Sequence, residues 1–345
     1  MSRVLLSDIF RAILGSVFTF SGLVKAIDPV GTSVFVEKYL ATYSLEVLLP
    51  AALPIAIALA VVEYTLGGLL LSGRAHRVTA LATLLFTLVF TLITLLSATI
   101  LPIGDCGCFG DAVRLTPMQT LVKNLVLLPM AVLLSLEAKA QRLNLLSLGL
   151  GVILSLSINL YALRYGPIVD FMPYAEGVNL REAVEHDRAA AEQRAVQLVF
   201  TDKTTGEELA FSADDATPWA DQNLEYLDTR ESDVKSSEKL PFADFILTNS
   251  LGEDLTLDLL GRERVTLLTI YDIDALERHL SETQALVGRD VVVLSSDHSE
   301  RVSELLGVEC LTIDAMTLRS VIRSRVGVVV LSHGVIERKC DIRDI

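Results

Sequence analysis

The chain has few of the residues that carry most enzyme chemistry. Its 345 residues include four cysteines, five histidines and one tryptophan, and aromatic residues make up 6% of the total. The sequence contains no Ser-His-Asp arrangement, no phosphate-binding glycine loop, no internal repeat and no low-complexity tract. These absences exclude a triad hydrolase, a P-loop nucleotide-binding protein and a repeat protein.

Basic side chains are far outnumbered by acidic ones in the second half of the chain. Residues 1–165 carry 11 basic and 8 acidic side chains, whereas residues 166–345 carry 18 basic and 35 acidic side chains. Such an acidic half disfavours nucleic acid as a partner, because phosphates repel it. The break in composition predicts two parts that lie in different environments.

Long apolar runs are abundant in the first half. About 20 mostly apolar residues are needed to cross about 30 Å of hydrocarbon. Five runs are candidates, and the last two are short: 9–27, 48–71, 78–101, 121–136 and 145–161. The sequence therefore predicts a helical bundle that crosses the lipid bilayer several times, followed by an extramembrane part.

Basic residues near the ends of these runs predict the orientation of the bundle. One side holds six of them and the other side three: Arg3, Arg11, Arg74, Arg77, Lys139 and Arg142 against Lys25, Lys38 and Arg114. The positive-inside rule places the N-terminus in the cytoplasm, so five spans leave residues 166–345 outside. We expect a bacterial inner membrane protein whose soluble part and whose loop around residue 106 share the oxidising periplasm.

The outer half begins with a connector and continues with an α/β pattern. "VQLVFTDKTTGEELAFS", at residues 196–212, alternates around a turn and predicts a β-hairpin within the connector 166–240. Residues 243–260 suggest two short strands joined by a turn. From residue 264 the pattern is β–α–β–α–β–α–β–β, which predicts a central sheet covered by helices.

This order, over residues 241–345, resembles the thioredoxin fold. Thioredoxin-like enzymes carry C-x-x-C where the first buried strand meets its helix, but this chain has "YDIDALE" there. Val326 stands where the family has a cis-proline. The resemblance therefore implies a thioredoxin-like soluble domain that docks or supports a partner and does not itself exchange disulfides. A disulfide between Cys310 and Cys340 is left open.

The densest chemical signal is "DCGCFGD", which places Cys106 and Cys108 on either side of Gly107. A disulfide between them would close a very small ring, and glycine tolerates the backbone angles that this ring requires. Strain would make such a bond easy to reduce, which suits redox exchange. The alternatives are a turn with two inactive cysteines and a metal site, although the histidines lie elsewhere and no metal is expected. "TPMQ", at residues 116–119, predicts a capped helix start directly after this loop.

Three charged residues in or near the spans are further site candidates. Glu63 lies near the middle of the second run, where an ionisable group is costly and often functional. A carboxyl group that is protonated or paired inside the bundle is the alternative. Lys25 and Lys123 approach the outer ends of their runs and are candidate charge partners near the cysteines, although extension toward the lipid interface would also explain them.

Three segments together resemble the DoxX-like membrane proteins, with the methylamine-utilisation protein MauE as the nearest branch. They are "RAILGSVFTFSGLVKAIDPVG", the glutamate in the second run and "CGCFGD". The resemblance implies a four-helix membrane domain over residues 1–140, to which this chain adds a fifth helix at 141–165. MauE-type proteins are associated with maturation of disulfide-rich periplasmic partners, and DoxX relatives with quinone-linked oxidation.

These observations predict a redox protein of the inner membrane. Cys106 and Cys108 would exchange electrons between a membrane carrier, with quinone as the candidate, and an extracytoplasmic thiol protein. Enzymatic activity as a thiol–disulfide or quinone-linked oxidoreductase is left open. One alternative is a non-catalytic anchor that helps to assemble an extracytoplasmic client. Another is a small-molecule transporter that uses Glu63 as its proton site.

Overall fold

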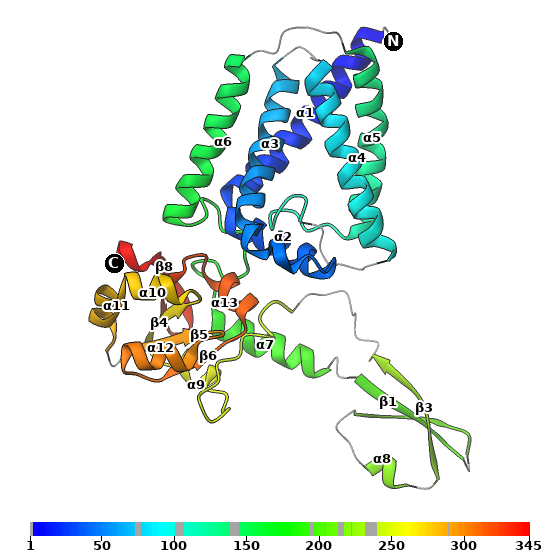
Figure 1. Ribbon diagram of the computed structural model, residues 1–345. Helices are drawn as coiled ribbons and strands as arrows, with labels where there is room; N and C mark the ends of the chain where they lie inside the picture. Colours follow the sequence, from blue (N-terminus) through cyan, green and yellow to red (C-terminus); the bar gives the residue numbers. More distant parts are fainter. Residues whose placement is uncertain are drawn as a thin grey trace. The chain divides into compact units, whose positions relative to one another are not determined.

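The protein divides into two compact units, Met1–Met172 and Pro173–Ile345, which the computed structural model in Figure 1 shows. The structure describes residues 3–72, 77–100, 107–138, 145–193, 196–203, 205–212, 217–221, 223–231, 240–288 and 290–345. Four residues used above lie outside these ranges: Cys106, Arg74, Lys139 and Arg142. Each unit is described by itself.

The first unit is built from long apolar helices. They are α1 (Arg3–Ile27), α3 (Ala52–Leu71), α4 (Arg77–Thr99), α5 (Pro117–Glu137) and α6 (Leu145–Tyr165), with α2 (Pro29–Thr42) and the 3-10 helix η1 (Glu46–Ala51) between α1 and α3. Within the described residues, five helical segments are long and apolar enough to cross a membrane. The five predicted runs are therefore confirmed as long apolar helices. The predicted helix start is confirmed as well, because Thr116 and Gln119 form a capping box at the beginning of α5.

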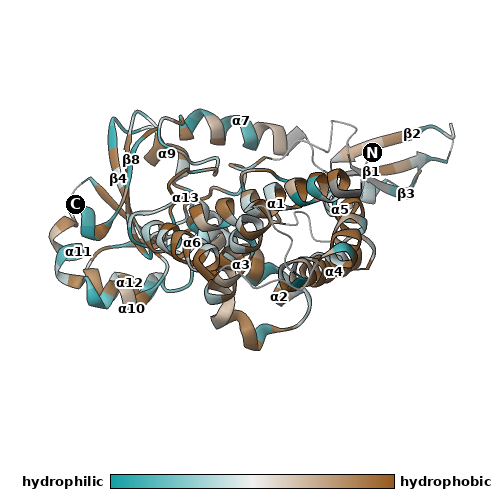
Figure 2. Ribbon diagram, turned by 90° about the horizontal axis from the view of Figure 1, so that it is seen from above, coloured by the Kyte–Doolittle hydropathy of each residue, from teal (hydrophilic) through white to brown (hydrophobic). Residues whose placement is uncertain are grey.

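Helix α4 turns small polar side chains toward the bundle and large apolar ones outward. Helix α4 buries threonines and a serine along one face: Thr79, Thr83, Thr87, Thr91, Thr94 and Ser97. Several of these hydroxyls donate to the carbonyl four residues earlier, as Thr87 Oγ1 does to the oxygen of Thr83 at 2.8 Å. Leu85, on the opposite face, is 63% exposed. Figure 2 shows the helices of this unit largely in the hydrophobic colour. An apolar exterior of this kind suits lipid contact, where polar groups must find partners inside.

Glycines set the closest approach in the bundle, where α1 crosses α3. A Cβ atom on Gly22 would lie 2.2 Å from the backbone nitrogen of Tyr64, and one on Gly67 would lie 2.3 Å from that of Thr19. Neither distance is sterically allowed, so the two backbones approach this closely only because both positions lack a side chain. The crossing brings the last turns of α1 against the middle of α3.

The second unit contains two separate sheets. The predicted hairpin is confirmed as β1 (Val196–Asp202) and β2 (Glu208–Ser212), and β3 (Leu224–Glu231), which we did not predict, pairs with the other side of β1. Phe200 is buried on this sheet beneath Trp219, which belongs to the short helix α8 (Thr217–Ala220).

The larger sheet follows the order predicted from residue 264 onward. Its strands are β4 (Arg264–Ile270), β5 (Val291–Ser295), β6 (Cys310–Thr312), β7 (Val326–Ser332) and β8 (Val335–Asp341), and the connecting helices are α10 (Ile273–Arg278), α11 (Leu280–Leu286), α12 (Ser299–Leu306) and α13 (Ala315–Val321), with the 3-10 helix η2 (Ile342–Asp344) at the end. The spatial order is β6-β5-β4-β7-β8. Strands β4, β5 and β6 are parallel, and β7 runs antiparallel to both β4 and β8.

Helix α7 (Leu180–Gln193) lies in the region that we assigned to the connector. Its Leu180 and Val184, together with Tyr174, are buried in the same apolar cluster as Leu267 of the central strand β4. The segment after residue 172 therefore contributes to the core of the second unit. The division into a connector at 166–240 and a domain at 241–345 stays a prediction.

The predicted pair of strands at 243–260 is wrong. Thr248 forms only isolated bridges, with Asp254 and with Thr312, and residues Thr256–Leu260 form the short helix α9. The Asp254 carboxylate accepts hydrogen bonds from the backbone N–H and the hydroxyl of Thr256, at 2.9 and 2.5 Å. These bonds satisfy donors at the start of the helix, which favours helix over strand at this point.

Cys310 and Cys340 do not form the disulfide that the sequence left open. Both are free thiols, and they belong to β6 and β8, at the two edges of the five-stranded sheet. Four strand spacings separate these edges by about 19 Å, which is far beyond the reach of a disulfide. Burial raises the pKa of the Cys310 thiol to about 12, so this thiol is unreactive.

Asp254 also joins α7 to α9, which makes it a test of how the second unit holds together. Arg188 Nη1 donates to Asp254 Oδ2 at 2.8 Å. Burial, the largest single influence, raises the pKa of this carboxyl, but the hydrogen bonds from Thr256 and the charge of Arg188 outweigh it and hold the pKa below its ordinary value. A lowered native-state pKa means that the stabilisation is complete above the unfolded-state pKa and is lost as the pH falls through the native-state pKa.

We therefore expect Asp254→Asn to lower the free energy of unfolding of the second unit by about 1–2 kcal/mol near pH 7. The difference from the wild type should shrink as the pH falls below about 4. Thermal unfolding of the full chain at neutral and acidic pH measures both effects. Asp258→Asn is the control, because Asp258 is 76% exposed and its carboxylate makes a long, weak contact of 3.6 Å with Arg262. Equal destabilisation by Asp254→Asn at both pH values would contradict the prediction.

Candidate functional site

A buried ion pair lies at the crossing of α1 and α3. Lys25 Nζ is 2.7 Å from Glu63 Oε2, and the two side chains are only 3% and 5% exposed. Glu63 comes from the middle of α3 and Lys25 from the last turn of α1. The two charges neutralise each other, which allows both to be buried in an apolar bundle.

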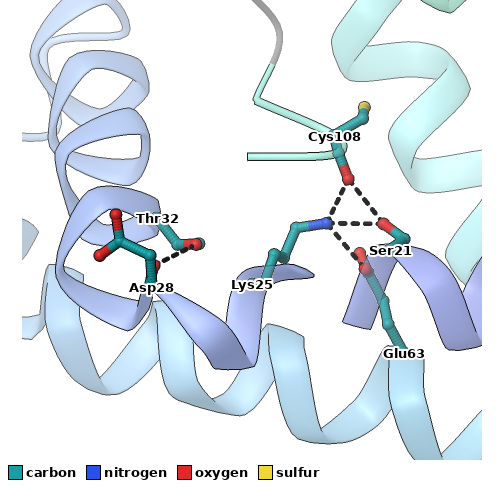
Figure 3. A network of polar contacts seen from close by, with 6 residues as sticks. All are labelled: Ser21, Lys25, Asp28, Thr32, Glu63 and Cys108. Atoms are coloured by element: carbon teal, nitrogen blue, oxygen red, sulfur yellow. Dashed lines mark hydrogen bonds and ion pairs between the residues drawn. The ribbon is translucent and has the colours of Figure 1, made fainter. Parts of the chain in front are cut away.

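The same lysine holds the cysteine loop. Lys25 Nζ donates to Ser21 Oγ at 2.7 Å and to the backbone carbonyl oxygen of Cys108 at 2.5 Å, and Ser21 Oγ donates to that carbonyl at 2.6 Å. Figure 3 shows Lys25 at the centre of this network, with the Cys108 carbonyl pointing toward it. An ammonium group has three N–H donors, and the three acceptors Glu63, Ser21 and Cys108 use all of them. We call these four residues the Lys25 cluster.

The cysteine loop has the backbone shape that a glycine permits. Gly107 has φ of +60°, in the left-handed region. The N–H of Gly110 donates a hydrogen bond to the carbonyl oxygen of Gly107 at 3.1 Å. A Cβ atom on Gly107 would lie 2.6 Å from Cγ of Phe35 in α2. Position 107 therefore needs glycine for both conformation and space, as the sequence predicted for conformation.

Lys123 contacts the loop through an aromatic ring. Its Nζ lies 4.4 Å from the ring centroid of Phe109, and that ring is 5.4 Å from the ring of Phe20 on α1. A cation over a ring face is a modest attraction. It places Lys123 beside the loop without bringing it into the Lys25 cluster.

A cavity of about 40 Å³ lies behind Cys108, between α1, α3, α4 and α5. Its polar lining comes from Ser21, Glu63, Thr87, Cys108, Lys123 and Asn124, and its apolar lining from Val17, Phe18, Phe86, Phe90 and Leu127. Ser21, Glu63 and Cys108 of the Lys25 cluster thus line one cavity together with Lys123.

The structure thus brings four of the predicted site residues to one region: Lys25, Glu63, Cys108 and Lys123. Cys106 lies outside the described residues. The sequence analysis missed Ser21 and Asn124, although Ser21 stands four residues before Lys25 and therefore on the same helix face. Among the residues that the structure describes, no group of three or more His, Cys, Asp and Glu could hold a metal ion.

The family model described as methylamine utilisation protein MauE matches residues 3–137. The first unit is MauE-like. The matched range runs from the start of α1 to the end of α5 and includes every residue of the Lys25 cluster. No curated protein and no solved structure matches the chain. With its apolar helices, this likeness makes the chain a multi-pass membrane protein.

The Lys25 cluster can fix the cysteine loop in place and can provide a buried ammonium and a buried carboxylate beside it. The two hydrogen bonds to the Cys108 carbonyl fix the backbone of the residue that carries the thiol. The ion pair beside it joins a carboxylate to an ammonium group, and the carboxylate of Glu63 lines the cavity.

Proposed function

We propose that this MauE-like protein is a redox protein of the inner membrane that takes part in methylamine utilisation. Cys106 and Cys108 form a reversible disulfide that accepts electrons from an extracytoplasmic thiol protein and passes them to a membrane quinone. The single observation that carries the proposal is the pair of buried hydrogen bonds that hold the Cys108 carbonyl on Lys25 and Ser21.

The proposed exchange balances in two steps. The client dithiol gives two electrons and two protons to the Cys106–Cys108 disulfide, so the client becomes a disulfide and the pair becomes a dithiol. The dithiol then gives two electrons and two protons to the quinone, which becomes quinol, and the disulfide forms again.

Burying a lysine and a glutamate inside a membrane bundle is costly even when they are paired. An apolar pair would serve a bundle that is only an anchor. The contact of Lys25 with the cysteine loop supports a role in which the position of Cys108 matters. The pairing of Glu63 with Lys25 also favours this role over a transporter that uses Glu63 alone as its proton site.

In this proposal the second unit is a thioredoxin-like support that receives the client. The β6-β5-β4-β7-β8 sheet supplies a rigid platform, and Cys310 and Cys340 lie too far apart to exchange a disulfide with each other. The membrane loop is then the place where thiol chemistry occurs, on the periplasmic side as the basic residues predict.

Replacing both Cys106 and Cys108 by Ser should abolish the redox function while the protein remains inserted and abundant. In intact cells, alkylation trapping of the wild type should find the pair partly reduced, in a proportion that changes with respiratory state. Replacing Cys310 and Cys340 by Ser is the control and should leave function unchanged. A pair that stays oxidised under every condition, with a functional double variant, would assign the loop a purely structural role.

A further inference from the structure

The cavity behind Cys108 has the size and the polar lining that a buried water molecule requires. Its volume of about 40 Å³ exceeds what one water needs, and Ser21, Glu63 and Asn124 on its wall offer hydrogen-bonding partners. Glu63 Oε2 accepts the hydrogen bond from Lys25, whereas Oε1 has no hydrogen-bond partner among the residues that the structure describes. A carboxylate oxygen is therefore available to water in this space.

The proposed exchange needs a proton acceptor at this place. A thiol reacts as its thiolate, so oxidation of the dithiol requires that the Cys108 sulfur first lose its proton. Cys108 is 8% exposed, which limits direct transfer of that proton to bulk water. Glu63 and Cys108 line the same cavity, so water inside it can connect them.

We propose that the cavity is a water-filled proton relay and that Glu63 is the group that receives the Cys108 proton. The inference rests on the proposed function and adds a proton route to it. The Cys108 thiol gives its proton to the cavity water, and the water gives a proton to the Glu63 carboxylate. Two protons leave the dithiol with the two electrons. The proton of Cys108 is transferred through Glu63, and the second proton comes from Cys106.

The Lys25 cluster keeps its net charge during this transfer. Before it, the ammonium of Lys25 pairs with the Glu63 carboxylate. After it, Glu63 is neutral and the negative charge is on Cys108, whose carbonyl Lys25 still holds.

Few other charges face this cavity. Among the described lining residues, α3 contributes Glu63 and α5 contributes Lys123, while those of α1 and α4 are uncharged. Lys25 of α1 does not line the cavity but pairs with Glu63, which does. After Cys108 the loop carries Asp111, which lies 3.5 Å from Arg114. Glu63 is therefore the only carboxylate among the described residues that line the cavity.

The test measures how fast the reduced pair is oxidised by a small aromatic disulfide, dithiodipyridine, between about pH 5 and about pH 9. The full chain carries Cys310→Ser and Cys340→Ser, so that only the pair reacts. Glu63→Gln should slow the reaction about 100-fold near pH 7 and make the rate rise steeply with hydroxide. The glutamine oxygen can still accept the bond from Lys25, so a residue that only positioned the loop would leave the pH profile unchanged.

A second variant blocks the water and keeps Glu63. Thr87→Leu places an apolar side chain into the cavity and should slow the reaction in the same way. Thr91→Leu is the matched control, because Thr91 is buried one turn further along the same face of α4 but does not line the cavity. Size-exclusion chromatography and helical circular dichroism confirm folding, and if one variant does not fold the other decides.

The relay is overturned if a folded Glu63→Gln or Thr87→Leu protein keeps the wild-type rate and pH profile. Equal slowing by Thr91→Leu would overturn it too, since a general packing defect would then explain the loss. These outcomes differ from failure of the proposed function, in which the cysteine pair itself is dispensable in cells.

Discussion

Lys25→Met is expected to lower the free energy of unfolding of the first unit by about 3–5 kcal/mol, the largest effect of any single polar substitution in the bundle. The variant leaves the Glu63 carboxylate buried without its counter-charge. It also removes a hydrogen bond from the carbonyl of Cys108. Thermal or denaturant unfolding of the detergent-solubilised chain measures the loss.

A double variant separates stability from function. Lys25→Met with Glu63→Leu removes both charges and should recover most of the stability, because an apolar pair of similar volume replaces the ion pair. Function should not recover, because Cys108 remains without its lysine. Lys123→Met is the single-site control and should cost about 1 kcal/mol or less, since its contact with Phe109 is a partly exposed cation–π interaction. A Lys25→Met protein as stable as the wild type would contradict the buried ion pair.

Gly67→Ala is expected to destabilise the bundle by about 3 kcal/mol or more, because overpacking here has no flexible neighbour to absorb it. The new Cβ atom would lie 2.3 Å from the backbone nitrogen of Thr19 and 2.8 Å from the carbonyl oxygen of Gly15. Helices α1 and α3 would have to separate. Since that crossing also brings Lys25 to Glu63, we expect the variant to lose the ion pair along with its stability.

The adjacent glycine supplies the control. A Cβ atom on Gly68 would meet nothing within 4 Å. Gly68→Ala should therefore be neutral or stabilising by up to about 1 kcal/mol, since alanine favours helix over glycine. Unfolding of the two variants under identical detergent conditions compares them directly. Similar stability for both would show that α1 and α3 do not cross as closely as described.

The sequence by itself determined the elements whose signals are local. Apolar runs of sufficient length predicted the five spans, because hydrocarbon thickness sets helix length whatever the helices pack against. The capping box at Thr116 and Gln119 and the hairpin at 196–212 were predictable for the same reason. In each case the residues that specify the structure are neighbours along the chain.

Local sequence patterns gave a wrong prediction, or none, where contacts with distant segments of the chain determine the secondary structure. Residues 256–260 have a strand-like pattern, yet the hydrogen bonds from Thr256 to Asp254 start a helix there. Strand β3 and helix α7 were not predicted, since β3 depends on pairing with β1 and α7 on burial of Leu180 and Val184 in the sheet's core.

The candidate site shows the same division. Position along the chain singled out Glu63, Lys25, Lys123 and the two cysteines, because a charge in or near an apolar run and two closely spaced cysteines in a cysteine-poor chain are unusual wherever they fold. Only the tertiary structure decided that Lys25 pairs with Glu63 and holds Cys108, residues that are 38 and 83 positions away from it. That choice depends on the glycines at which α1 and α3 meet, and on a three-dimensional crossing that no periodicity within one helix can encode.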